Sequence, residues 1–124
     1  MSLILIVEDN EKNMKLVRDI LQAMGYEPLE ATTGEEALVV AAESAPALVL
    51  MDIQLPDLDG AEALRRLRSD ERTAGIPVLA LTAQAMEGDR ERFLAAGFDG
   101  YLSKPVDVDE LIATVQRYCD GGAE

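Results

Sequence analysis

Five short apolar runs, each followed by a segment of helical periodicity, constrain the fold of this chain more than any other feature. Residues 3–7 form a continuous β-prone run, which is typical of a strand covered on both faces. Residues 11–24 then carry apolar side chains spaced three or four apart, which predicts one buried helical face ending at Gly25. Because this alternation continues along the chain, the sequence predicts a parallel sheet with helices on both faces and right-handed crossovers.

The remaining elements are predicted from the same alternation. Further strands are expected at residues 26–30, 47–51, 77–81 and around 101–102, and further helices at residues 34–44, at a segment carrying Leu64 and Leu67, at about 86–96 and at 107–119. Pro28 places the second strand near a sheet edge, because proline cannot donate to a central ladder. Gly60 is interpreted as a turn residue before the third helix. The last helix is expected to face inward through Val108, Leu111, Ile112 and Val115.

Length and charge narrow the class of protein further. The 124 residues fit one domain, expected over residues 1–120 with a frayed tail at 121–124. The net charge of −13 disfavours direct binding to DNA or to anionic membranes, which are themselves polyanions. The first apolar run is too short for a signal peptide or a membrane span, so we expect a cytoplasmic protein without membrane insertion.

The chain contains no histidine and a single cysteine, Cys119. This excludes Ser-His-Asp and Cys-His nucleophile systems, the usual zinc sites and an intramolecular disulfide. Cys119 is expected to pack on the last helix. Any histidine chemistry must therefore come from a partner.

Polar residues end four of the five predicted strands, at the rim where parallel sheets bind ligands. They are Glu8, Asp9 and Asn10 after the first strand, Asp52 after the third, Thr82 after the fourth, and Ser103 and Lys104 after the fifth. Several have a simpler interpretation: Asp9, Asn10 and Thr82 could be helix N-caps, and Lys104 a solvated surface lysine. Asp52 is harder to explain in this way, because a lone carboxylate in an apolar context is costly.

The combination of these strand-end residues indicates a particular chemistry more specifically than any one of them alone. If the first and third strands are neighbours, Glu8, Asp9 and Asp52 converge, and protonation or a cation must relieve their repulsion. Oxygen ligands of this kind select a hard ion such as Mg²⁺. Lys104 and Thr82 would add an ammonium and a hydroxyl, which with a metal suit a transferring phosphoryl group. A carboxylate beside them can act as the nucleophile and form an aspartyl phosphate.

Four segments of the sequence resemble the receiver domain of two-component response regulators, and the resemblance covers essentially the whole chain. They are Leu5 to Asn10, Leu50 to Pro56 continuing to Asp59-Gly60, Ala80 to Ala83, and Tyr101 to Pro105. The chain is most similar to CheY-like regulators of the single-domain DivK type, and receivers inside hybrid histidine kinases share the same features. The resemblance implies a flavodoxin-like (βα)5 fold with strand order 2-1-3-4-5.

The resemblance also implies a role for each site residue. Asp52 would be the phosphoacceptor. The Mg²⁺ ligands would be Asp9, Asp52, the backbone carbonyl of Gln54 and, mainly through water, Glu8. Lys104 would bind the phosphoryl group, with a cis peptide to Pro105, while Thr82 and Tyr101 would form the switch.

The implied function is a phosphorylation switch rather than an enzyme acting on other substrates. A histidine kinase or a histidine phosphotransfer protein would donate the phosphoryl group, and a downstream regulatory protein would bind the altered surface, with no DNA-binding output domain. A Mg²⁺-dependent phosphatase fits less well, because Gln54 stands where such enzymes carry a second Asp. A flavodoxin-like cofactor module needs a phosphate-cradling loop, whereas this chain has the acidic residues 8–11 there.

Overall fold

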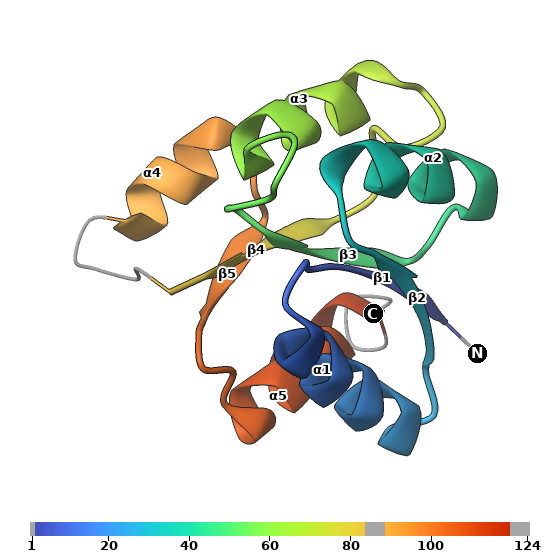
Figure 1. The fold of residues 1–124 in the computed structure, drawn as a ribbon, viewed down its shortest axis with the longest axis vertical. Helices are drawn as coiled ribbons and strands as arrows, with labels where there is room; N and C mark the ends of the chain where they lie inside the picture. Colours follow the sequence, from blue (N-terminus) through green and yellow to red (C-terminus); the bar gives the residue numbers. More distant parts are fainter. Residues whose placement is uncertain (1, 84–88, 120–124) are drawn as a thin grey trace.

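The computed structural model describes residues 2–83 and 89–119, with five parallel strands in the order β2-β1-β3-β4-β5. The strands are β1 (Leu3–Val7), β2 (Glu27–Ala31), β3 (Leu48–Asp52), β4 (Val78–Thr82) and β5 (Gly100–Ser103). The helices are α1 (Glu11–Ala23), α2 (Gly34–Ser44), α3 (Gly60–Ser69), α4 (Asp89–Ala96) and α5 (Val108–Cys119). Helices α1 and α5 cover one face of the sheet, and α2, α3 and α4 cover the other (Figure 1). The predicted fold class and strand order are confirmed.

The alternation of side chains along the strands divides the interior into two cores. Even-numbered β1 residues such as Ile4 and Ile6 pack with α1 and α5, whereas Leu5 and Val7 pack on the side of α2 and α3. The same alternation runs through β3 and β4, whose residues are all buried. This burial on both faces explains why these strands are continuous apolar runs.

Three local signals in the sequence have the predicted structural outcome. Asn10 is the N-cap of α1, and its side chain accepts a hydrogen bond from the Asn13 N–H at 3.0 Å. Gly25, just after the same helix, has a φ of +90°, which glycine adopts without strain. The strand that contains Pro28 is an edge strand, as expected.

The interpretation of Gly60 as a turn residue is wrong, because the structure shows a different physical reason for glycine at this position. Gly60 is the first residue of α3, and an added Cβ would lie 2.7 Å from the Cα of Ile53. Its N–H donates to the carbonyl of Ile53 at 2.9 Å. The glycine is needed because two backbone segments approach closely, not because of turn geometry.

The prediction that Val108 faces inward is also wrong. Val108 is 45% exposed, whereas Leu111 and Val115 are buried and Ile112 is partly buried. The buried face of α5 therefore begins one turn after the first residue of the helix.

Other boundaries differ by one or a few residues. β3 and β4 each extend one residue further than predicted, so that Asp52 and Thr82 are their last residues. The predicted start of the fourth helix at residue 86 and the predicted tail at 121–124 lie outside the described residues. Within the described ranges, no helix is long and apolar enough to cross a membrane.

Candidate functional site

The sheet order brings the polar strand ends to one edge of the molecule. β1, β3, β4 and β5 are successive neighbours in the sheet, and Asp52 is in register with Leu81 while Thr82 is in register with Ser103. Lys104 follows β5 directly, and its N–H donates to the carbonyl of Thr82 at 2.7 Å. The four strand ends that the sequence singled out therefore meet at the same rim.

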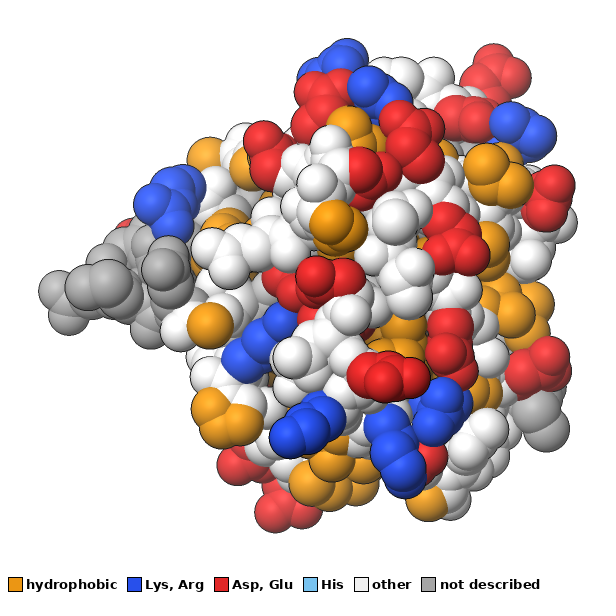
Figure 2. Space-filling view, viewed as in Figure 1, with side chains coloured by type: hydrophobic (Ala, Val, Ile, Leu, Met, Phe, Trp, Pro, Cys, Tyr) orange, Lys and Arg blue, Asp and Glu red, His pale blue; other side chains and the backbone are white. Residues whose placement is uncertain are grey.

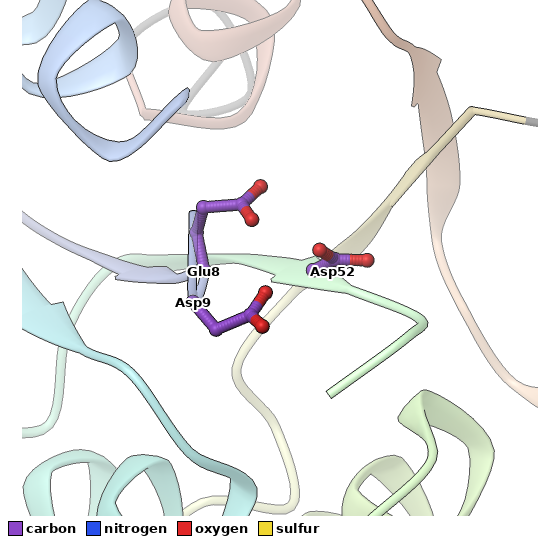
Figure 3. Close-up of side chains that lie close together, drawn as sticks. All are labelled: Glu8, Asp9 and Asp52. Carbon is purple, nitrogen blue, oxygen red and sulfur yellow. The ribbon is translucent and has the colours of Figure 1, made fainter. Parts of the chain in front are cut away.

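Three carboxylates from two neighbouring strands converge at this rim. Glu8 and Asp9 follow β1, Asp52 ends β3, and their side chains point toward a common space (Figure 3). One oxygen from each lies within 4.8 Å of the others. Glu8 and Asp52 are buried, whereas Asp9 is exposed, which leaves the pocket open to solvent on one side. Among the residues described, these three side chains form the one cluster of three or more possible ligands that lie close enough together to hold a metal ion.

Lys104 joins the two buried carboxylates. Its Nζ lies 2.6 Å from Glu8 Oε1 and 2.8 Å from Asp52 Oδ2, and its side chain is only 15% exposed. The interpretation of Lys104 as a solvated surface residue is therefore wrong. The ammonium supplies the positive charge that two adjacent buried carboxylates require.

The surroundings shift the titration of both partners of this ion pair. Burial raises the pKa of Glu8, and this effect exceeds the opposing hydrogen bonds from Lys104 and from the Asn10 N–H. Burial alone would lower the pKa of Lys104, but its hydrogen bonds to Asp52 and Glu8 outweigh burial and leave that pKa raised. Lys104 therefore stays charged at neutral pH.

Asp52 is held through both of its carboxylate oxygens. Oδ1 accepts the backbone N–H of Gln54 at 2.8 Å, and Oδ2 accepts a hydrogen bond from Lys104. The turn that follows β3 thus fixes the orientation of the carboxylate at the point where the strand ends. An oriented carboxylate with a fixed cation beside it is suited to react with an anionic electrophile.

The remaining predicted residues surround this centre. Thr82 is buried as the last residue of β4. Tyr101 is half-buried, and its ring centroid lies 5.7 Å from that of Phe93 in α4. The Lys104–Pro105 peptide is cis, the geometry that the resemblance implied. The N-cap of α1 is Asn10 and not Asp9. The exposed Asp9 therefore belongs to the acidic pocket and not to the helix cap.

Sequence reasoning missed two residues near the site. Phe93 forms an edge-to-face pair with Phe98 at 6.2 Å in addition to its contact with Tyr101. Asp57 lies in the loop after β3 and bonds to the first residues of α2. Neither has a local signal in the sequence, because each role depends on side-chain contacts outside the residue's own helix or loop.

The fold and this acidic pocket define the class of protein. The profile of the response regulator receiver domain matches residues 4–116. The chain therefore belongs to the response regulator receiver domain family.

Individual relatives agree with this assignment. The polar-differentiation response regulator DivK of Brucella ovis is 50% identical over 115 residues, covering 93% of this chain and 94% of the relative. The receiver domain of the Pseudomonas aeruginosa sensor histidine kinase PA1611, with a magnesium ion coordinated in its active-site cleft, is 39% identical with a TM-score of 0.86. That alignment covers 94% of this chain and 96% of the other.

A third similar structure contains a partner. It is the co-crystal structure of the Saccharomyces cerevisiae histidine phosphotransfer protein Ypd1 with the receiver domain of its downstream response regulator Ssk1. That match has 31% identity and a TM-score of 0.86, and covers 94% of this chain and 88% of the other. The chain is thus a receiver domain with an acidic pocket that could bind a metal ion.

Proposed function

We propose that this receiver domain accepts a phosphoryl group on Asp52 from a phosphohistidine of a histidine kinase or a histidine phosphotransfer protein. The observation that carries the proposal is the arrangement around Asp52, a buried carboxylate with Lys104 Nζ at 2.8 Å and two further carboxylates beside it. Because the chain contains no histidine, a phosphohistidine donor must belong to another protein. The co-crystallised phosphotransfer protein of a similar receiver supports such a partner.

The transfer balances without any further reactant. A carboxylate oxygen of Asp52 forms a bond to phosphorus while the bond between phosphorus and the donor imidazole nitrogen breaks. The electron pair of the broken bond returns to that nitrogen, and the imidazole leaves as a neutral base because its other ring nitrogen already carries a proton in the phosphohistidine that reacts. Lys104 stays protonated. Its ammonium exchanges its contact with the Asp52 carboxylate for contacts with the oxygens of the incoming phosphoryl group.

The acidic pocket fits Mg²⁺ as the resident metal ion. Asp9, Asp52 and the backbone carbonyl of Gln54 would be ligands, with Glu8 acting mainly through water, and all of these donors are oxygen atoms. When bound, the ion supplies positive charge for the equatorial oxygens of the phosphoryl group. The magnesium ion in the cleft of the similar PA1611 receiver supports this choice of metal.

Phosphorylation then alters a protein-binding surface through Thr82 and Tyr101. The hydroxyl of Thr82, at the end of the neighbouring strand, would bind the phosphoryl group. Tyr101 would turn inward, losing its present contact with Phe93 on α4. The local change of charge thus favours one of two arrangements of α4 and β5, and a downstream regulatory protein would recognise the altered face.

The proposal is tested by incubation with acetyl phosphate, with and without Mg²⁺, followed by intact mass measurement. We expect the gain of one phosphoryl group in the wild type only when Mg²⁺ is present. Asp52→Asn should gain none, because an amide is a poor nucleophile. The matched control is Asp59→Asn in the following loop, where the side chain caps α3, and this variant should be labelled as the wild type is.

Labelling that persists in Asp52→Asn would contradict the assignment of the phosphoacceptor. A protein that neither gains mass nor binds beryllofluoride in the presence of Mg²⁺ would overturn the phosphorylation switch itself. The partner class is tested separately, by transfer from a phosphorylated histidine phosphotransfer protein to the wild type and to Asp52→Asn.

A further inference from the structure

The loop between β3 and α3 is connected to a helix that contributes no residue to the site. Asp57 in this loop accepts two backbone hydrogen bonds from the start of α2: Gly34 N–H to Oδ1 at 2.7 Å and Glu35 N–H to Oδ2 at 3.0 Å. α2 already has its own N-cap, because the Thr33 side chain accepts the N–H of Glu36 at 3.1 Å. Asp57 therefore does more than cap a helix, since it joins two elements that are distant in sequence.

Close packing reinforces this connection. Gly34 is buried, and an added Cβ there would lie 3.0 Å from the Cβ of Leu58, the residue after Asp57. The tip of the loop thus rests directly on the backbone of α2. A side chain at position 34 would push the loop away from the helix.

The bonds to Asp57 are charge-assisted. The N–H groups of Glu35 and Gly34 lower the pKa of Asp57, so that this carboxylate remains ionised at neutral pH. Hydrogen bonds to an ionised acceptor are roughly twice as strong as neutral ones, and the helix dipole favours a negative charge at this end.

The base of the same loop lies in the phosphoacceptor site. Gln54 donates its N–H to Asp52 Oδ1 at 2.8 Å, and it forms an isolated β-bridge with Asp59. Gly60 N–H donates to the carbonyl of Ile53 at 2.9 Å. The loop is therefore held at its base by backbone contacts, in which Gln54 takes part, and at its tip by Asp57.

We propose that Asp57 is a positioning residue that holds the β3–α3 loop, and with it the backbone carbonyl of Gln54, in the arrangement that binds the metal ion. This inference rests on the proposed function, in which Gln54 is a ligand of Mg²⁺. Because linkage is reciprocal, metal binding must strengthen the contact between Asp57 and α2. The start of α2 is then coupled to the occupancy of a site to which it contributes no ligand.

The experiment compares Asp57→Ala with Thr33→Ala by calorimetric titration with MgCl2. Thr33→Ala removes the intrinsic cap of the same helix but leaves the loop contact in place, so it is the matched control. Asp57→Ala should raise the Kd for Mg²⁺ about tenfold, the lower end of the effect seen for residues that hold metal ligands in place. Thr33→Ala should leave the Kd unchanged, and Asp57→Asn, which keeps one acceptor oxygen, should be intermediate.

Hydrogen exchange gives a second readout that a purely structural role would not change. In the wild type, Mg²⁺ should slow amide exchange at Gly34 and Glu35, and in Asp57→Ala the exchange at these amides should be independent of Mg²⁺. Equal Mg²⁺ affinity in Asp57→Ala and the wild type would overturn the inference, as would an equal rise of Kd in Thr33→Ala. A wild type that binds no Mg²⁺ would instead overturn the proposed metal site, and this is seen before any variant is compared.

Discussion

Lys104 is the residue on which the charge balance of the site depends. Its ammonium contacts Glu8 and Asp52 at 2.6 and 2.8 Å, and both carboxylates are buried. A metal ion in the acidic pocket would supply positive charge to the same carboxylates. Lys104 and the metal ion are therefore partly alternative counter-charges for one pocket.

The substitution Lys104→Met tests this interpretation. Without metal, we expect the free energy of unfolding to fall by about 3 kcal/mol, because two buried carboxylates lose their cation. The Kd for Mg²⁺ should fall as well, since the bound ion no longer faces a neighbouring ammonium. Urea unfolding in the presence of a chelator and calorimetric Mg²⁺ titration measure the two effects.

Arg72→Met serves as the control for this substitution. Arg72 pairs with Asp70, and its side chain is 66% exposed, so we expect its loss to leave the free energy of unfolding nearly unchanged. Weaker Mg²⁺ binding in Lys104→Met than in Arg72→Met would contradict the view that Lys104 competes with the metal ion.

A second prediction at the scale of a single residue concerns the effect of a side chain at Gly60 on stability. Gly60→Ala should destabilise the protein by about 3 kcal/mol, because its Cβ would meet backbone 2.7 Å away that cannot rotate aside. Gly75→Ala is the matched control, since no atom lies within 4 Å of an added Cβ there, and its effect should be within about 1 kcal/mol. Equal unfolding midpoints of the two variants would show that the approach of α3 to Ile53 adapts to a methyl group.

At the scale of elements, one arginine joins the end of α3 to two loops and a strand. Arg68 donates to the carbonyls of Ala74 and Ile76 at 3.1 and 2.6 Å, and to the carboxylate of Asp99 at 3.0 Å. Asp99 in turn accepts the N–H of Val78, the first residue of β4, at 2.7 Å. These bonds fix the start of β4 and the turn before β5 relative to α3.

Arg68→Ala should therefore lower the free energy of unfolding by about 2 kcal/mol, since several charge-assisted hydrogen bonds are lost together. Arg68→Lys should recover less than half of this loss, because a single ammonium cannot reproduce the planar fork of donors. Chemical unfolding of both variants measures the difference. Full recovery in Arg68→Lys would mean that charge alone, rather than the geometry of the guanidinium, holds these elements.

The elements also show what the sequence could and could not predict. The strands and the strand-end residues Asp52 and Thr82 were found because apolar runs and the polar residues after them are local patterns. The exposure of Val108 and the close approach at Gly60 were missed, because both depend on where one element meets another. The Asp57 contact with α2 was missed for the same reason, since Asp57 and Gly34 are 23 positions apart in the sequence.

The position of the candidate site, like the fold, could be predicted only in part from the sequence. A parallel sheet brings all of its strand ends to one rim, so the convergence of Glu8 and Asp52 followed once their strands were adjacent. The bridging position of Lys104 between those carboxylates did not follow. It depends on side-chain geometry across three strand ends, which no spacing in the sequence encodes.

At the scale of the whole molecule, excess negative charge opposes the compact state. The chain carries 24 acidic and 11 basic residues, and acidic side chains are spread widely over the face seen in Figure 2. Monovalent salt should therefore raise the melting temperature, because it screens the repulsion among these charges.

Mg²⁺ should stabilise the protein beyond this screening effect at equal ionic strength. A free concentration of about one hundred times Kd contributes about 2.7 kcal/mol when the ion binds only the folded state. Asp9→Asn should lose this extra stabilisation while keeping the response to monovalent salt, as thermal unfolding in matched KCl and MgCl2 would show. The same Mg²⁺ response in both proteins would remove Asp9 from the metal site.

Because the sheet divides the interior, each of its two faces can be given a reporter of its own. Cys119, the single thiol of the chain, packs with the core under α1 and α5, whereas Phe93 belongs to the core under α2, α3 and α4. The chain has no tryptophan, so Phe93→Trp would introduce its single indole, which can be excited selectively over the three tyrosines of the protein. Thiol reactivity and indole emission can then follow the two sides of one sheet separately, in the same sample and at the same time.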